Sequence, residues 1–259
     1  MIAPVNFSTD LTGRVALVTG ASSGLGVRFA EVLAASGAKV AVAGRRRERL
    51  EAVAATIREA GGTAEPIVLD VSQASEIPRA IDEIEAKLGQ VDILVNNAGV
   101  PDKTYSVKMT LEDIDLSFNT NLRGPWILSV EVARRLIAAK APGWIVNISS
   151  LGAYVYSARA GANSLYSTTK AALIRMTEAH AMDWAKFNIN VNAIAPGTFT
   201  SEMVDGMIER VGDGFLKNFP RPRIGRTEQL DSTLLFLVSP SSDFVTGTCI
   251  KVDDGQMSR

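Results

Sequence analysis

Short runs of apolar residues alternate with longer amphipathic stretches along almost the whole chain. Seven runs are rich in valine and isoleucine with little polar alternation, as expected for parallel strands covered on both faces: residues 15–19, 39–43, 66–69, 93–96, 144–148, 190–194 and 248–252. Helical spacing of apolar positions covers residues 24–36, 48–60, 74–88, 111–139, 164–186 and 228–237. This alternation predicts an α/β fold with a doubly wound parallel sheet of about seven strands and right-handed crossovers.

The length and composition predict one domain. The chain has 259 residues, of which 46% are hydrophobic, enough to bury one sizeable core. No repeat or linker divides it, so we expect a single domain over residues 1–259, with a polar leader at 1–10. Segment 198–226 mixes glycine, proline, charged and aromatic residues, which is typical of a lid over a ligand site. Its apolar residues predict an apolar substrate pocket, although packing of a short helix explains them equally well.

The charge and residue counts exclude several functional classes. The 27 basic and 28 acidic residues give a net charge of −1 without a basic block, so we expect no nucleic-acid partner. Cys249 is the only cysteine and His180 the only histidine, which argues against a disulfide, a His/Cys metal site or a Ser-His-Asp triad. There is no signal peptide pattern and no apolar stretch near the ~20 residues that span a bilayer. We therefore expect a cytoplasmic protein with no metal and no membrane partner.

A segment rich in small residues follows the first predicted strand at 19–26. Small residues let the backbone approach an anion, and the helix that opens here presents N–H groups and the positive end of its dipole. The position between strand and helix predicts a cradle for a dinucleotide pyrophosphate, although the spacing is looser than G-x-G-x-x-G and could serve only a tight turn. The residues assigned to this cradle are Gly20, Ser22, Ser23, Gly24, Leu25 and Gly26.

The end of the second predicted strand bears on the choice between NADP and NAD. A carboxylate there would bind the ribose hydroxyls and repel a 2′-phosphate, but Arg45 and Arg46 precede the first acidic residue, Glu48. Guanidinium groups suit bidentate contact with a phosphate, so we predict NADP(H), with NAD(H) as the alternative if these arginines are merely solvated. After the third strand, Asp70 is placed to bind the adenine amino group or to cap the following helix, with Val71 beside it.

Tyr166 and Lys170 lie four residues apart in a predicted helix, downstream of Ser149 and Ser150. Residues four apart share a helix face, so the phenol and the ammonium can point into one pocket. A nearby cation stabilises phenolate, and we expect it to lower the pKa of Tyr166 from about 10 toward neutral pH. Such a phenol can exchange a proton with an alcohol or carbonyl oxygen. A core tyrosine beside a solvated lysine would show the same spacing.

Together these motifs resemble the short-chain dehydrogenase/reductase family, in its compact single-domain branch with a Rossmann fold. The resemblance covers residues 11–255. The motifs stand in the family's order: residues 19–26, Asn96-Asn97-Ala98-Gly99, Asn121, Ser149-Ser150, Tyr166-x-x-x-Lys170 and Pro196-Gly197. The resemblance implies an oxidoreductase that interconverts a ketone or aldehyde, or a 3-oxoacyl group, and its alcohol by hydride transfer. A non-catalytic nucleotide-sensing protein would be expected to have lost the tyrosine or the lysine.

The resemblance also implies a catalytic tetrad of Asn121, Ser150, Tyr166 and Lys170. Tyr166 would be the general acid in reduction and the base in oxidation, while Ser150 would donate a hydrogen bond to the substrate oxygen. Lys170 would lower the tyrosine pKa and hold the nicotinamide ribose. Asn121 would hold a water that relays protons. Ser150 is preferred to Ser149 because the family's serine aligns with the second residue of this pair.

Further cofactor contacts and an assembly state follow from the same resemblance. The implied contacts are Asn97, Ala98 and Gly99 near the adenosine ribose, Pro196, Gly197 and Phe199 facing the nicotinamide, and Ser201 at its carboxamide or a phosphate. A few extra residues before Tyr166, in loop 154–163, are interpreted as a substrate-shaping insertion in which Tyr154, Tyr156 and Arg159 add a polar edge. Helices 111–139 and 164–186 would form the contact of a homotetramer, or a homodimer.

Overall fold

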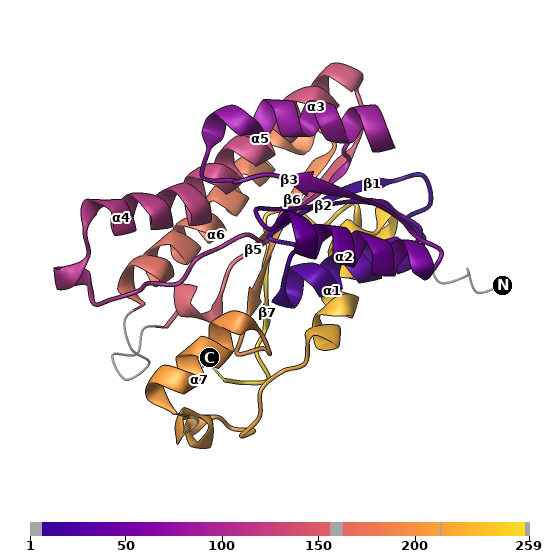
Figure 1. Ribbon diagram of the computed structural model, residues 1–259. Helices are drawn as coiled ribbons and strands as arrows, with labels where there is room; N and C mark the ends of the chain where they lie inside the picture. Colours follow the sequence, from indigo (N-terminus) through magenta and orange to yellow (C-terminus); the bar gives the residue numbers. More distant parts are fainter. Residues whose placement is uncertain (1–6, 156–162, 213, 257–259) are drawn as a thin grey trace.

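The computed structural model describes residues 7–155, 163–212 and 214–256, apart from the side chains of residues 207, 210 and 211 (Figure 1). Its centre is a seven-stranded sheet with the order β3-β2-β1-β4-β5-β6-β7, in which every pairing is parallel. The strands are β1 Val15–Thr19, β2 Lys39–Gly44, β3 Thr63–Val68, β4 Ile93–Asn96, β5 Gly143–Ile148, β6 Ile189–Pro196 and β7 Cys249–Val252. The order reverses between β1 and β4, which confirms the predicted doubly wound sheet.

Helices cover both faces of this sheet. They are α1 Gly24–Ala35, α2 Arg47–Glu59, α3 Ile77–Leu88, α4 Leu111–Phe118, α5 Gly124–Ala139, α6 Ser164–Trp184, α7 Glu202–Val211 and α8 Asp231–Val238. One apolar core joins the sheet to α1, α2 and α8, and a second joins it to α3, α5 and α6 (Figure 1). Along β1, Ala16 and Val18 enter the first core while Val15 and Leu17 enter the second. Because successive side chains alternate between two buried faces, the strand is apolar throughout.

Two predicted elements differ from the structure. The helix expected over residues 111–139 is interrupted by a π-helical turn at Asn119–Arg123, which separates α4 from α5. Such turns are frequent at functional sites, and this one contains Asn121. The third strand begins at Thr63 and includes Pro66, three residues earlier than predicted. Proline is tolerated there because β3 is an edge strand.

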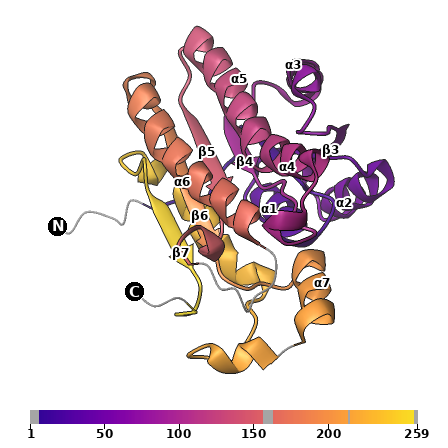
Figure 2. The same ribbon diagram turned by 90° about the vertical axis from the view of Figure 1, so that its left-hand side faces the viewer.

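Segment 198–226 contains α7 and a 3₁₀ turn at Gly214–Asn218, and α7 lies apart from both helix layers (Figure 1 and Figure 2). The backbone closes the base of this segment. Thr200 N–H donates to the Gly225 carbonyl at 3.0 Å, and Gly225 N–H donates to the Thr198 carbonyl at 2.9 Å. The buried Phe199 ring packs over Gly225, where a Cβ would lie 2.7 Å from the ring. The segment is thus tied at its base to the rest of the chain.

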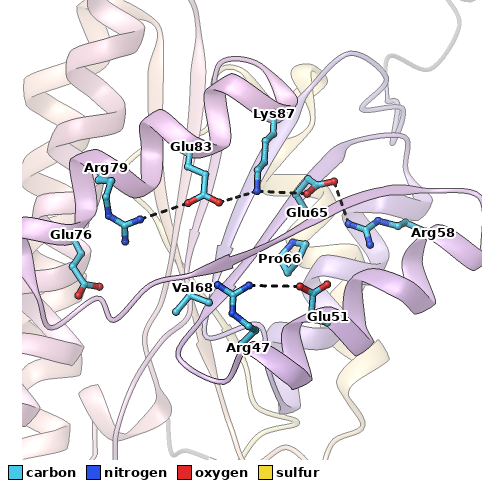
Figure 3. Close-up of a pocket in the computed structure, with 10 residues that line it drawn as sticks. All are labelled: Arg47, Glu51, Arg58, Glu65, Pro66, Val68, Glu76, Arg79, Glu83 and Lys87. Carbon is cyan, nitrogen blue, oxygen red and sulfur yellow. Dashed lines mark hydrogen bonds and ion pairs between the residues drawn. The ribbon is translucent and has the colours of Figure 1, made fainter.

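A groove beside the edge strand β3, which we call the β3 groove, is lined mainly by charged side chains (Figure 3). Its residues are Arg47, Glu51, Arg58, Glu65, Pro66, Val68, Glu76, Arg79, Glu83 and Lys87. Glu65 on β3 pairs with Arg58 at 3.2 Å and with Lys87 at 3.9 Å, and Lys87 also pairs with Glu83 at 2.8 Å. Charged side chains and proline discourage an edge strand from pairing with another chain. Of the helices in the described ranges, none has the length and apolar character needed to cross a membrane.

Candidate active site

Tyr166, Lys170 and Ser150 converge where β5 ends against α6. Lys170 is only 3% exposed, and its Nζ donates a hydrogen bond of 2.8 Å to the carbonyl of Ile148, the last residue of β5. The same nitrogen lies 5.7 Å from the centroid of the half-buried Tyr166 ring. The hydroxyl of Ser150, two residues after β5, forms a hydrogen bond with the Tyr166 phenol. Ser150, which precedes Tyr166 by 16 positions and Lys170 by 20, therefore joins them in one polar cluster.

The charge states in this cluster differ from the sequence expectation. The pKa of Tyr166 is raised above its ordinary value of 10, because burial disfavours the phenolate and the Asp102 carboxylate adds to this effect, while the Ser150 hydrogen bond opposes it. Burial also lowers the pKa of Lys170 to about 8. The expectation that Lys170 brings the pKa of Tyr166 down toward neutral is therefore wrong for this arrangement. A buried ammonium is itself prone to lose its charge.

The two neighbouring serines have different surroundings. Ser149 is buried, and its Oγ donates to the carbonyl of Lys170 at 2.8 Å, which joins the end of β5 to the backbone of α6. Ser150 instead contacts the Tyr166 phenol, and its Oγ accepts a hydrogen bond from Gly152 N–H at 3.0 Å. Of the two, Ser150 is the hydroxyl beside the phenol.

Asn121 lies fully buried in the π-helical turn between α4 and α5. Its Oδ1 accepts from Val100 N–H at 2.8 Å, and its Nδ2 donates to the Val100 carbonyl at 3.0 Å and to Thr169 Oγ1 on α6 at 3.2 Å. A Cβ on Gly99 would lie 3.4 Å from both Asn121 Oδ1 and Lys170 Nζ. The segment after β4 therefore brings Asn121 and Lys170 close together.

The glycine-rich segment forms a tight backbone turn at the start of α1. Gly20 has φ +65°, and a Cβ there would lie 2.9 Å from the Cα of Ala98. A Cβ on Gly26 would lie 2.3 Å from the Gly20 carbonyl oxygen, so this site also excludes a side chain. Asn97 fixes the turn, because its Nδ2 donates to the carbonyls of Thr19 at 3.0 Å and Gly20 at 3.3 Å. The Asn97 amide thus supports the cradle.

The first turn of α1 suits an anion. Ser23 occupies the N-cap position, but among the described residues no side chain caps this turn and no acidic residue lies in it. The first N–H groups of a helix have no intrahelical partner, and the positive end of the helix dipole lies here. The turn that the glycines shape and the start of α1 therefore fit a pyrophosphate group.

Arg46, the N-cap residue of α2, reaches the serines of this cradle. Arg46 donates to Ser22 Oγ at 3.0 and 3.1 Å and to Ser23 Oγ at 2.8 Å. Its third contact is with Glu202, the first residue of α7, at 3.1 Å. Arg49, one turn further along α2, pairs with the other oxygen of the same carboxylate. Sequence analysis missed Arg49, although its position three residues after Arg46 places both on one helix face.

The other predicted cofactor residues are distributed around the same edge of the sheet. Arg45 is exposed between β2 and α2. Asp70 Oδ1 accepts from Ser72 N–H at 3.0 Å and Ser72 Oγ at 2.8 Å, so it forms a local turn. The helix-cap alternative for Asp70 is wrong, because Glu76 holds the N-cap position of α3. Val71 is buried and its carbonyl lies against Gly124 at the start of α5.

The turn after β6 is braced by the C-terminal segment. Pro196 ends β6, and a Cβ on Gly197 would lie 2.6 Å from Gln256 Oε1, which accepts from Thr198 N–H at 2.7 Å. Ser201 caps α7, with its Oγ accepting from Val204 N–H at 3.3 Å. A Cβ on Gly24 would lie 3.2 Å from Ser201 Cβ, so α7 begins beside the glycine-rich turn.

Two expected residues cannot be placed, and Asp102 is a further residue that was not predicted. Tyr156 and Arg159, predicted to shape the substrate site, lie outside the described residues. Tyr154 is partly exposed, with its ring 4.2 Å from the Lys251 ammonium. Asp102 was not predicted, yet both its oxygens accept backbone hydrogen bonds from the start of α6. Its only sequence signal is an acidic residue three positions after Gly99. Within the described ranges, no His, Cys, Asp and Glu side chains cluster as a metal site would require.

The sequence is similar to a known protein family and to several of its members. A family model described as short chain dehydrogenase matches residues 14–211. The chain is 36% identical to a sorbitol dehydrogenase of Cereibacter sphaeroides over 258 residues, which covers 95% of this chain and 98% of the relative. It is 34% identical to the 3-oxoacyl-[acyl-carrier-protein] reductase FabG of Thermotoga maritima over 245 residues, with 95% and 98% of the two chains covered.

A solved structure extends the similarity to a nucleotide complex. The gluconate 5-dehydrogenase of Burkholderia cenocepacia, crystallised with NADP and tartrate, superposes with a TM-score of 0.89 at 33% sequence identity. The match covers 97% of this chain and 98% of that protein. Sequence and fold therefore agree over nearly the full length of both chains.

Proposed function

The chain belongs to the short chain dehydrogenase family and is an oxidoreductase; we propose that it transfers hydride between NADP(H) and a small-molecule carbonyl or alcohol. One observation carries the proposal: Ser150, Tyr166 and Lys170 form a polar cluster at the carboxyl end of β5. Gly99 lies beside Lys170 and Ala98 beside Gly20, so this cluster and the pyrophosphate cradle adjoin the same segment after β4.

Tyr166 would manage the proton of the reaction. When bound, the reduced nicotinamide supplies a hydride, which forms the new C–H bond at the carbonyl carbon. Tyr166 donates its phenolic proton to the carbonyl oxygen, and Ser150 stabilises the charge on that oxygen with a hydrogen bond. The products are the alcohol and the oxidised cofactor. In the oxidative direction, Tyr166 accepts the proton of the alcohol.

Lys170 and Asn121 would return the proton to Tyr166. The pKa of Lys170, lowered to about 8 by burial, lies close enough to physiological pH for its ammonium to release and regain a proton. Asn121 joins α6 through Thr169 and the segment after β4 through Val100, so it can hold a relaying water beside Lys170. The raised pKa of Tyr166 favours the protonated phenol, which is the form that reduction requires.

The preference for NADP(H) rests on two arginines that already hold an anion. Arg46 and Arg49 bind both oxygens of the Glu202 carboxylate, while Arg46 also contacts the hydroxyls of Ser22 and Ser23 in the cradle. A ribose 2′-phosphate offers a larger negative charge than a carboxylate and more acceptor oxygens. The NADP complex of the gluconate 5-dehydrogenase relative supports this choice. NAD(H) is the alternative cofactor.

The substrate-binding side and the assembly complete the proposal. We propose that segment 198–226 acts as a lid in a single-domain protein, because α7 begins beside the glycine-rich turn and its first residue, Glu202, contacts Arg46 and Arg49.

We also propose a homotetramer or homodimer in the cytoplasm. Trp126 on α5 and Met182 on α6 are 47% and 82% exposed, which supports an interface on these helices. Analytical ultracentrifugation of the purified protein would test the assembly.

The test is oxidation of NADPH and NADH, followed by absorbance, with a panel of polyhydroxylated ketones, keto acids and 3-oxoacyl esters. We expect turnover that favours NADPH and is nearly lost in Tyr166→Phe. A preference for NADH would overturn the cofactor assignment alone. Turnover that survives in Tyr166→Phe would overturn the proposed mechanism.

A further inference from the structure

Asp102 is a buried carboxylate for which the proposed reaction has no role. It lies in the segment between β4 and α4 and is 3% exposed. Its Oδ1 accepts a hydrogen bond from Tyr166 N–H and its Oδ2 one from Leu165 N–H, both at 2.9 Å. These bonds join residues 64 and 63 positions apart. Burying a carboxylate costs free energy unless its oxygens are hydrogen-bonded. Because both oxygens of Asp102 bond to the start of α6, we look for a specific role of this residue there.

The two N–H groups belong to the first turn of the helix that carries the proposed catalytic residues. α6 begins at Ser164, and the amides of its first turn have no partner inside the helix. Asn163 occupies the N-cap position, but in the part of the chain that the structure describes its side chain makes no capping bond. Asp102, which lies in another segment, therefore accepts the hydrogen bonds that a local capping side chain would otherwise accept. Its negative charge also lies at the positive end of the helix dipole.

The segment that contains Asp102 is fixed along its length. Asn97 bonds to the backbone of the glycine-rich turn, and Val100 exchanges two hydrogen bonds with the Asn121 side chain. Two residues later, Asp102 holds Tyr166 N–H itself. A short stretch of chain thus connects the cofactor cradle directly to the backbone of Tyr166.

We propose that Asp102 is a positioning residue that fixes the first turn of α6, and with it Tyr166, relative to the cofactor cradle. This inference rests on the proposed function of Tyr166. Asp102 also acts through its charge, because the carboxylate raises the pKa of Tyr166 together with burial. The Ser150 hydroxyl acts on the phenol in the opposite sense, and the Lys170 ammonium lies 5.7 Å from the ring centroid. Asp102 therefore helps to keep the phenol protonated.

The test compares Asp102→Asn with Asp113→Asn. Asp113 accepts a bond from Thr110 N–H in the capping box of α4, so the control makes the same chemical change at the start of a different helix. An asparagine at 102 keeps one acceptor oxygen but loses the charge and the second backbone bond. We expect kcat to fall roughly 10- to 100-fold with little change in KM, since a small misplacement of a reacting group has an effect of this size. Asp113→Asn should retain wild-type kcat.

A second readout separates this inference from the proposed function. Protein labelled with 3-fluorotyrosine gives a ¹⁹F NMR signal for Tyr166, assigned by its loss in Tyr166→Phe, and its titration needs no substrate. We expect the Tyr166 signal to titrate at lower pH in Asp102→Asn than in wild type, and no shift in Asp113→Asn. A merely structural role would leave that titration unchanged. An unchanged titration together with unchanged kcat in a folded Asp102→Asn variant would overturn the proposal.

Amide hydrogen exchange keeps the proposal testable if Asp102→Asn does not fold. In wild-type protein the amides of Leu165 and Tyr166 should exchange at least ~10-fold more slowly than they would without a partner, because each is bonded to Asp102. Exchange of both amides at the rate of unprotected groups would contradict the geometry on which the proposal depends.

Discussion

The β3 groove and the cluster around Tyr166 both gather ionisable side chains, but they differ in burial. In the groove, Glu65, Glu83 and Lys87 form ion pairs with one another (Figure 3). Their side chains are 33%, 35% and 42% exposed. In the cluster, Lys170 is 3% exposed, and within the described residues its Nζ bonds to a backbone carbonyl and forms no ion pair. Water screens the groove, so its charges are ordinary surface pairs. Burial without a counter-charge is what gives Lys170 an altered pKa.

The difference shows which of the two regions to examine for function. The groove has many more charges, yet most of them are paired with a neighbour and open to solvent, which suits solubility and protection of an edge strand. The cluster has few charges, and their protonation depends on the protein around them. Ionisable groups whose pKa is shifted by burial cluster at functional sites, whereas exposed ion pairs are ordinary surface features. Substitutions in the two regions should therefore have effects of very different size.

The largest effect should follow from removing the phenol. Tyr166→Phe keeps the ring but removes the proposed proton donor, so we expect kcat to fall by about 10³-fold or more, at the upper part of the range for general acid–base catalysis. Steady-state kinetics with NADPH would measure this. Its counterpart in the groove is Glu83→Gln, which should leave kcat unchanged. Comparable losses in both variants would mean that the two regions do not differ in function.

The second prediction compares two lysines by the pH dependence of stability. Lys170 has a pKa of about 8 in the folded protein against an ordinary value of 10.5. Between these pH values the unfolded chain binds more protons than the folded chain, so the free energy of unfolding should rise with pH. At about 1.4 kcal/mol per unit the rise amounts to ~3 kcal/mol across this window. Lys170→Met should remove it.

Lys87→Met is the matched control, because Lys87 is a partly exposed groove lysine paired with Glu83 and Glu65. Urea denaturation of both variants and the wild type at several pH values from 7.5 to 10.5 gives the slopes. We expect the wild-type slope to persist in Lys87→Met. A slope that also persists in Lys170→Met would show that other groups produce it and would contradict the lowered pKa of Lys170 as its cause.

The third prediction concerns the ion pair between Arg46 and Glu202, which lies beside the cradle. Arg46 is 41% exposed, close to the 43% of Arg58 in the groove, but it also contacts Ser22 and Ser23. If it binds the 2′-phosphate, Arg46→Ala should reduce kcat/KM for NADPH by about 10- to 100-fold, the size of one or two charge-assisted hydrogen bonds, with little effect on NADH. Glu202→Gln should have the opposite sign and raise the affinity for NADPH, because a competing carboxylate is removed from Arg46 and Arg49.

Isothermal titration with both cofactors would measure these changes directly. Arg47→Ala is the control, since Arg47 lies in the β3 groove and pairs only weakly, at 3.9 Å, with Glu51. Equal weakening of NADPH and NADH in Arg46→Ala would contradict the assignment of this arginine to the 2′-phosphate.

The sequence was sufficient for features that repeat along the chain or lie close together in it. Strands buried on two faces have continuous apolar runs, so the sheet was predicted. The ends of β3 were misjudged, because Thr63, Glu65 and Pro66 obscure the pattern: the strand begins three residues earlier than predicted and ends one residue earlier. The spacing of Tyr166 and Lys170 was readable because both lie on one helix. Asp102 and Glu202 were missed because their partners are distant in sequence, and neither belongs to a local motif. The direction of the Tyr166 pKa shift was missed because it depends on burial, which sequence spacing does not reveal.

The smallest effect should follow from breaking the central ion pair of the groove. Glu65→Gln removes the partner of Arg58 and of Lys87, whose side chains are 43% and 42% exposed. Exposed pairs contribute about 0.2–1 kcal/mol, so we expect a loss of stability within that range and no change in kcat. The loss should shrink further in 0.5–1 M salt, where screening extends over only a few ångströms. Urea denaturation at low and high salt measures it. A loss well above ~1 kcal/mol that resists salt would mean that the groove is coupled to the core, and the contrast with Lys170 would then fail.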